Sequence, residues 1–168
     1  KLVDGAEDGG GWLTLTLFEK GARDDAACAA MPTACAVAGS LPLASFGVVK
    51  VSVMMPGTHV WPHCGPTNAR LRLHLGLQVP SSEYMIKVRD APPRAWKEGE
   101  VLLFDDSFEH EVWNLTDQPR LVLIVDIWHP QLDTDEKRLK AMASEDERAI
   151  YKGVVHRRFY HNTTERGK

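Results

Sequence analysis

The 168-residue chain has 43% hydrophobic and 26% charged residues, a composition typical of one folded domain, which excludes a disordered or fibrous protein. Its apolar runs fall short of the roughly 18 residues that a membrane-spanning helix needs. The formal net charge of -3, from 20 basic and 23 acidic residues, gives no overall attraction to nucleic acid, so any anion site has to be local.

Short strand-like runs separated by turn residues follow one another along the chain without an internal repeat. The predicted strands are Trp12–Phe18, Phe46–Met55, Arg70–Leu77, Tyr84–Arg89, Val101–Phe104, His110–Leu115 and Arg120–Trp128. Pro56-Gly57 ends the second of these strands. The segment Asp24–Ser40, between the first two, is predicted to be a loop or a short helical turn.

One convincing helix is predicted, because Asp133 is a good N-cap residue and Glu136 follows three positions later. Its pattern continues to about Tyr151. We therefore divide the chain into a jelly-roll domain, residues 1–132, and a C-terminal helix with a basic extension, residues 133–168. Short strands with one helical appendage predict an all-β, double-sheet jelly roll, whose mouth can enclose a small polar ligand.

The most regular predicted strand is RLRLHLGL, from Arg70 to Leu77, in which polar and apolar residues alternate. Successive side chains of a strand point to opposite faces, so Arg70, Arg72 and His74 share one face and four leucines share the other. Two cations and an imidazole are costly to bury unless their face is wet or meets anions. The pattern alone leaves two possibilities open, a solvent-exposed outer face and an inner wall that binds an anion.

Three histidines lie near predicted strands where they could bind a metal. His59 and His63 flank Trp61-Pro62, and His110 opens a later strand. Two histidines with open positions suit a non-haem iron site that must also bind a cosubstrate and dioxygen. Such sites usually add a carboxylate two residues beyond the first histidine, but here that position is Gly65. Spacing alone therefore leaves a purely structural role for the histidines open.

Three long segments closely resemble the aspartyl/asparaginyl β-hydroxylase family, and together they fall within about Trp12 to Leu132. They are MMPGTHVWPHCGPTNARLRLHLGL (Met54 to Leu77), WKEGEVLLFDDSFEHEVWN (Trp96 to Asn114) and RLVLIVDIWHP (Arg120 to Pro130). Members of this family are iron(II)- and 2-oxoglutarate-dependent dioxygenases with a double-stranded β-helix, a cupin-like jelly roll. They bind iron through two histidines without the carboxylate. The resemblance thus implies this fold, this activity, and Fe(II), 2-oxoglutarate and O2, and it agrees with Gly65.

The resemblance also implies roles for individual residues. His63 and His110 match the iron ligands, and the 2-oxoglutarate contacts match Trp12, Ser52, Arg72, Leu73, His74 and Arg120. We assign Arg72 and His74, with the two iron ligands, to the catalytic set. Because alternate residues of a strand share a face, Arg72 and His74 can reach one ligand, whereas Leu73 packs the other way. The planar fork of Arg120 and the hydroxyl of Ser52 suit the distal carboxylate of 2-oxoglutarate.

Cys28 and Cys35 lie seven residues apart, in a stretch where a short loop could bring the two thiols together. From spacing alone, three reduced thiols in a cytosolic protein are an equal alternative. The family enzyme of the endoplasmic reticulum has a disulfide at these positions, so the resemblance implies a Cys28–Cys35 disulfide with Cys64 free. Two N-x-[ST] sequons, at Asn114 and Asn162, are weakly compatible with a secretory compartment.

We expect a hydroxylase acting on the β-carbon of aspartyl or asparaginyl residues in a protein or peptide, with a small disulfide-rich luminal domain as one candidate substrate. We expect it in the lumen of the secretory pathway, in the endoplasmic reticulum, with membrane contact only through a segment outside this chain and without nucleic acid as a partner. The alternatives are a catalytically silent module that binds metal and 2-oxoglutarate, a hydroxylase of lipid acyl chains, and a metal-binding cupin isomerase or storage protein.

Several neighbouring residues have plainer interpretations. His59 is expected near the site or on the substrate side, and Cys64 is expected to point away from the metal. The acidic residues expected in a solvated turn are Asp105, Asp106 and Glu109. The tryptophans expected in the core or at the rim are Trp61, Trp113 and Trp128.

Overall fold

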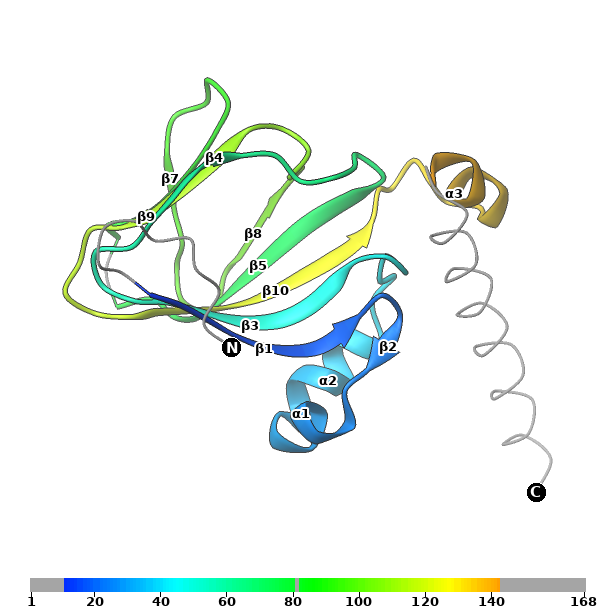
Figure 1. The fold of residues 1–168 in the computed structure, drawn as a ribbon, viewed down its shortest axis with the longest axis horizontal. Coiled ribbons are helices and arrows are strands. Elements are labelled where there is room, and N and C mark those ends of the chain that lie inside the picture. The colour runs from blue at the N-terminus through cyan, green and yellow to red at the C-terminus, as the bar shows by residue number, and fades with distance from the viewer. Residues whose placement is uncertain (1–10, 81, 143–168) are drawn as a thin grey trace.

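The computed structural model describes residues 11–80 and 82–142, which form two antiparallel β-sheets and three short helices (Figure 1). The larger sheet has the strand order β2-β1-β3-β10-β5-β8. Its strands are β1 (Trp12–Glu19), β2 (Ala22–Arg23), β3 (Val48–Met54), β5 (Arg70–Gln78), β8 (Val101–Phe104) and β10 (Arg120–Trp128). The smaller sheet has the order β4-β9-β6-β7. Its strands are β4 (His59–His63), β6 (Tyr84–Val88), β7 (Arg94–Ala95) and β9 (His110–Asn114).

The two sheets face each other across an apolar core, which confirms the predicted two-sheet, cupin-like β fold. Both sheets contribute to this core: Met54, Leu102, Phe104, Val122 and Ile124 come from the larger one, and Tyr84, Ile86 and Val112 from the smaller. The inner face of the larger sheet is apolar only in part. The alternation of β3, β5 and β10 also turns polar side chains inward, and that half of the interior forms the candidate site.

Two helices, α1 (Asp25–Ala30) and α2 (Pro32–Gly39), pack on the outer face of the larger sheet, beside β1 and β3 (Figure 1). The segment predicted as a loop or short turn is therefore two helices. Its start is explained by Asp24, whose side-chain Oδ1 accepts a hydrogen bond from Ala27 N at 2.9 Å. A disulfide joins Cys28 of α1 to Cys35 of α2 with a Cα–Cα distance of 5.6 Å, and Cys64 is free and exposed.

The predicted C-terminal helix is shorter than the sequence pattern indicated. Helix α3 (Asp135–Ala141) has Thr134 as its N-cap, because Thr134 Oγ1 accepts from Lys137 N at 3.3 Å. Asp133, the predicted cap, forms an ion pair with Lys137 Nζ at 2.6 Å instead. The helix ends at Ala141, since Met142 has an extended backbone, and the rest of the prediction to Tyr151 lies outside the described residues. The division at residue 132 stays a prediction.

Strand β4 was missed in the sequence because Pro62 and two histidines interrupt any apolar alternation. Its pairing with β9 also contains an irregularity between Val60 and His63. This unpredicted strand carries one of the candidate metal ligands. Within the described residues, none of the helices has the length and apolar character needed to cross a membrane.

Candidate functional site

A narrow pocket between the two sheets brings together nearly all of the predicted site residues. Its polar lining comes from Trp12, Lys50, Ser52, His63, Arg72, His74, His110 and Arg120. Leu73 is the exception, because its side chain packs on the outer face of the larger sheet against the core beneath α1 and α2. The pocket has about 40 Å³ of free space, room for one or two waters, so a five-carbon ligand requires side chains at its mouth to move.

His63 and His110 are direct cross-strand partners on β4 and β9, with ring centroids 4.2 Å apart. Each imidazole bonds through Nδ1 to a backbone carbonyl two residues earlier, that of Trp61 at 2.7 Å and that of Phe108 at 2.9 Å. A carbonyl only accepts, so both Nδ1 atoms carry the proton and both Nε2 lone pairs are free. Metal-binding histidines commonly have this outer hydrogen bond. Burial also lowers the pKa of His110, which favours the neutral form that a metal requires.

A carboxylate does not complete this site in the part of the chain that the structure describes, where no group of three or more potential metal-binding side chains occurs. At Gly65 there is no room for one. A Cβ added there would lie 2.5 Å from Asp106 Oδ2, and Gly65 N donates to Asp106 O at 2.6 Å. The residues therefore fit a metal held by two histidines, with the remaining coordination positions left to other ligands.

Arg120, at the start of β10, is a buried cation with unused hydrogen-bonding capacity. It is 2% exposed, its Nε and Nη1 have no hydrogen-bond partner, and no described carboxylate forms an ion pair with it. Its guanidinium lies 4.4 Å from the centroid of the Trp96 ring. Burial lowers the pKa of Arg120 to about 10. Because an unpaired buried charge is unfavourable, this position fits an anionic ligand that is not part of the chain.

His74 supplies a second unpaired donor to the same pocket. Trp96 Nε1 donates to His74 Nδ1 at 3.3 Å, so the proton of the neutral ring lies on Nε2, which is buried and has no partner. Burial, reinforced by the charges of Arg120 and Arg72, lowers the pKa of His74 well below its usual value. The ring is therefore a neutral donor aimed at a ligand, and Trp96, which the sequence analysis did not single out, fixes its tautomer.

Ser52 and Lys50 extend this set of donors along β3. Trp12 Nε1 donates to Ser52 Oγ at 2.6 Å, which leaves the hydroxyl proton of Ser52 free to donate to a ligand. Lys50, which the sequence analysis missed, places Nζ 5.2 Å from the centroid of the Trp12 ring. Burial and the nearby Arg72 charge lower the pKa of Lys50. The alternation of β3 could have identified Lys50, because it shares a face with Ser52 and Met54.

Arg72 differs from Arg120 because its charge is already paired. Its Nε and Nη2 donate to the two carboxylate oxygens of Asp126 at 2.8 and 3.1 Å, and its Nη1 lies 3.2 Å from Asp106 Oδ2. Arg70 bonds the same two carboxylates, Asp106 at 2.7 Å and Asp126 at 2.8 Å. The polar face of β5 therefore points inward, toward anions, and is not the solvent-exposed face that the sequence left open.

The expectation that Asp106 lies in a solvated turn is wrong. Its side chain is fully buried, because the cations Arg70 and Arg72 point inward and need a carboxylate partner there. His59 lies on the outer face of the smaller sheet, away from the pocket, where its Nε2 is 3.2 Å from Glu111 Oε2 and its ring is 4.4 Å from that of Trp61. Of the three tryptophans, Trp61 is half exposed and Trp128 is buried.

The sequon at Asn114 gives no support for glycosylation, because this side chain is fully buried. Its amide nitrogen donates to three backbone carbonyls, those of Met54, Met55 and Gln118, and its oxygen accepts from Thr116. An amide used in this way holds the turn after β9 and cannot carry a glycan in the folded protein. The sequon at Asn162 lies outside the described residues.

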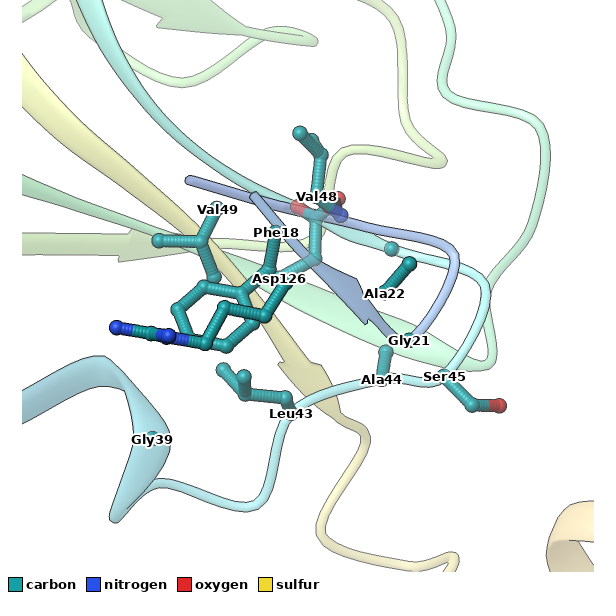
Figure 2. A pocket seen from close by; sticks show the side chains of 12 residues that line it. Phe18, Gly21, Ala22, Gly39, Leu43, Ala44, Ser45, Val48, Val49 and Asp126 are labelled. Atoms are coloured by element: carbon teal, nitrogen blue, oxygen red, sulfur yellow. Dashed lines mark hydrogen bonds between the residues drawn. The ribbon is translucent and has the colours of Figure 1, made fainter. Parts of the chain in front are cut away.

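A second cavity, larger at about 460 Å³, lies where the end of β1 and the turn to β2 meet the segment that leads into β3 (Figure 2). Its two charged side chains are Arg23 and Asp126. Both are already paired, Arg23 with Asp25 and Asp126 with Arg70 and Arg72. We therefore place the candidate site in the smaller pocket, which contains the unpaired donors.

The fold and the pocket define a class of protein: a cupin-like, two-sheet protein with two free imidazole nitrogens in the same pocket as a buried arginine that has no ion pair with a described carboxylate. The model of the family "Aspartyl/Asparaginyl beta-hydroxylase" matches residues 2–130, and the chain belongs to this family. This confirms the resemblance of the three sequence segments.

Known relatives agree with this assignment. The human protein "Aspartyl/asparaginyl beta-hydroxylase" is 46% identical over 132 residues, which are 77% of this chain and 17% of the human protein. The "Ornithine lipid ester-linked acyl 2-hydroxylase" of Rhizobium tropici is 39% identical over 120 residues, 71% of this chain and 42% of that protein. The chain thus spans less than half of either relative. A solved structure titled a predicted oxalate decarboxylase, from Thermotoga maritima, is 16% identical with a TM-score of 0.48, covering 77% of this chain and 91% of that chain.

Proposed function

We propose that the protein is an iron(II)- and 2-oxoglutarate-dependent dioxygenase that hydroxylates the β-carbon of aspartyl or asparaginyl residues in a protein substrate. Family membership supports the hydroxylase class. The observation that carries the cosubstrate assignment is Arg120, a buried cation without a partner in the described chain, in the same pocket as the free Nε2 atoms of His63 and His110.

In this proposal His63 and His110 hold the iron, and their backbone hydrogen bonds keep both rings in the tautomer that can bind it. Bound iron, with 2-oxoglutarate as the electron donor, supplies the oxidising power that inserts one oxygen atom of O2 into a C–H bond while 2-oxoglutarate becomes succinate and carbon dioxide. Because Gly65 has no side chain, the metal coordination position that a carboxylate fills in other members of the wider class stays available to another ligand.

The remaining polar side chains orient the cosubstrate. Along β5 and β10, Arg120 lies toward one end of the pocket, His74 faces Ile124 further along, and Arg72 faces Asp126 near the histidine pair. A ligand with a carboxylate at each end matches this arrangement. Arg120 and Ser52 bind its distal carboxylate, while His74 Nε2 and the remaining Arg72 donors bind along its length toward the metal.

Lipid acyl chains are the alternative substrate class, because the relative from Rhizobium tropici is named as an acyl hydroxylase of an ornithine lipid. The pocket described here holds the cosubstrate and the metal, and it does not by itself distinguish a peptide from an acyl chain. The higher identity to the human relative, 46% against 39%, favours the peptide.

We place the protein in the lumen of the secretory pathway, in the endoplasmic reticulum. The supporting observation is the buried disulfide between Cys28 and Cys35, since such bonds persist mainly in oxidising compartments. This proposal does not depend on glycosylation at Asn114.

The test is succinate formation from 2-oxoglutarate with added iron(II), measured alone, with aspartyl- and asparaginyl-containing peptides of small disulfide-rich domains, and with ornithine lipid. We expect peptide-dependent succinate and a hydroxylated peptide with a mass increase of one oxygen atom. His110→Ala is the matched control and should give neither product. Lipid-dependent turnover without peptide turnover would move the assignment to the acyl hydroxylases, and wild-type protein that neither binds nor consumes 2-oxoglutarate would refute the dioxygenase.

A further inference from the structure

Asp126 of β10 is a buried carboxylate to which the reaction assigns no role. It is the cross-strand partner of Arg72, and its side chain is fully buried. Oδ1 accepts from Arg72 Nε at 2.8 Å, while Oδ2 accepts from Arg72 Nη2 at 3.1 Å and from Arg70 Nη1 at 2.8 Å. The grip on Arg72 is therefore bidentate, the geometry that fixes a guanidinium most firmly.

The backbone that leads into β3 contacts the Asp126 side chain on the side away from Arg72. Val48 N donates to Asp126 Oδ2 at 3.0 Å, and a Cβ added at Gly47 would lie 2.5 Å from Asp126 Cβ. Asp126 also lines the larger cavity, among Phe18, Leu43 and Val49 (Figure 2). The backbone before β3 thus presses against Asp126 on one side, and Asp126 holds Arg72 on the other.

The contacts of Arg72 determine how many of its N–H groups remain for a ligand in the pocket. A guanidinium has five N–H groups. Asp126 takes one from Nε and one from Nη2 of Arg72, and Asp106 faces Nη1 at 3.2 Å, which leaves two N–H groups on a guanidinium that lines the pocket. Without Asp126, the Arg72 guanidinium loses the two hydrogen bonds that fix the orientation of its plane.

We propose that Asp126 is a positioning residue, which aims the unused N–H groups of Arg72 at the cosubstrate. This inference rests on the proposed binding of 2-oxoglutarate. It separates the two pocket arginines by role: Arg120 supplies uncompensated charge, and Arg72, neutralised by Asp126, supplies direction. A purely structural Asp126 would stabilise the fold without any effect on the affinity of the folded protein for 2-oxoglutarate.

Asp126→Asn is the informative change, because it nearly preserves shape and removes the charge. The new amide NH2 group would replace one of the two carboxylate oxygens and would face a donor in either orientation. In the place of Oδ1 it would face Arg72 Nε, and in the place of Oδ2 it would face Arg70, Arg72 and Val48 N. The variant should bind 2-oxoglutarate at least about tenfold more weakly than the wild type, which is about 1.4 kcal/mol. Isothermal titration of 2-oxoglutarate into the full, manganese-loaded protein measures this, at a temperature where thermal unfolding shows every variant folded.

The double-mutant cycle with Arg72→Gln supplies a result that a structural role would not produce. If Asp126 acts through Arg72, Asp126→Asn should change 2-oxoglutarate affinity less than about twofold once Arg72 is already Gln. Asp133→Asn, on the surface, is the matched control and should bind like the wild type. Should the Asn variant fail to fold, Gly47→Ala keeps every charge and displaces Asp126 from behind, and it should also weaken 2-oxoglutarate binding while manganese affinity is retained.

Three results would overturn the proposal: unchanged affinity in Asp126→Asn and Gly47→Ala, equal losses with and without Arg72, or tighter binding in Asp126→Asn, which would make the carboxylate a counter-charge instead of a positioning group. Failure of the underlying function looks different. In that case the wild type itself shows no 2-oxoglutarate binding in the same titration.

Discussion

Replacing Arg120 with Met should stabilise the ligand-free protein and at the same time weaken its binding of 2-oxoglutarate. The two effects have one cause: Arg120 is a buried cation that has no anionic partner among the described residues. Burial lowers the pKa of Arg120 to about 10, and at 1.36 kcal/mol per pKa unit this shift corresponds to an unfavourable free energy of roughly 3 kcal/mol for the charged form. The Trp96 ring, 4.4 Å away, offsets part of this cost by a cation–π contact.

Met has a similar length and no charge, so Arg120→Met should raise the free energy of unfolding of the ligand-free protein by about 1–3 kcal/mol. For a chain of this size, each kcal/mol corresponds to roughly 2–4 °C in Tm. Arg120→Lys keeps a charge in the same apolar surroundings and should not stabilise. The penalty applies wherever Arg120 is charged, which is at all pH values below about 10, and it fades only as the pH rises above that value. The stability difference should therefore be equal at pH 6 and pH 8.

The effect on the ligand has the opposite sign. A charge-assisted hydrogen bond to a buried carboxylate contributes about 1.5–3 kcal/mol, so Arg120→Met should weaken 2-oxoglutarate binding by roughly 10- to 100-fold. Arg120→Lys keeps the charge but loses the planar fork and should fall between. Manganese affinity without 2-oxoglutarate should be unchanged, because the metal ligands His63 and His110 are on other strands.

Thermal unfolding and calorimetric titration on the same three proteins decide the matter. With manganese present throughout, added 2-oxoglutarate should raise the Tm of the wild type and should raise that of Arg120→Met much less at the same concentration. A Met variant that is less stable than the wild type without ligand, and still binds 2-oxoglutarate with wild-type affinity, would contradict this prediction. That pair of results would make Arg120 a structural residue that packs on Trp96.

Three further predictions concern other parts of the molecule. His63→Ala and His110→Ala should each abolish turnover and sharply weaken manganese retention measured by metal analysis after dialysis, and unchanged metal content in both would contradict the two-histidine site. The Cys28→Ser/Cys35→Ser double variant should lose about 2–3 kcal/mol of stability in denaturant unfolding; recovery of both cysteines as free thiols from unreduced wild type would count against the disulfide. Because the pKa of His74 is well below its unfolded value near 6.5, stability should fall as the pH drops below 6.5, by up to about 1.4 kcal/mol per pH unit, with His110 acting in the same direction. His74→Gln should reduce that slope in denaturant titrations between pH 6.5 and pH 5.

The parts of the fold that alternate regularly could be predicted from the sequence. The alternation that begins at Arg70 predicted this strand to within one residue of its observed end, Gln78. It also predicted which side chains share a face, because alternate residues of a strand point to opposite sides of the sheet. Strand β4 could not be predicted, since its pairing is fixed by β9, a segment about fifty residues away in the chain. The start of α3 was misplaced by one residue because Asp133 and Thr134 are both good caps, and only the folded backbone selects Thr134.

The resemblance gave the site residues and their expected roles, but not the contacts that hold each side chain in place. The structure brings Ser52, His74 and Arg120 into one pocket with the two histidines, and their roles there stay a prediction. Their hydrogen-bond partners could not be inferred, because Trp96 and Asp126 are distant in the chain from the residues that they hold. An acidic pair such as Asp105-Asp106 looks like an ordinary solvated turn until the cations that face it are known.

Three arginines of the larger sheet illustrate why pairing, more than charge, identifies a ligand site. Arg70, Arg72 and Arg120 all point into the same interior, and in the sequence they differ only in position. Two carboxylates neutralise the first two arginines, and glycines make room for both: Gly65 for Asp106 and Gly47 for Asp126. The described residues provide two such partners and none for Arg120, so this cation is kept at a cost in stability. Under the proposed function that cost is recovered when the distal carboxylate of 2-oxoglutarate enters the pocket, and the replacement of Arg120 should therefore separate stability from binding.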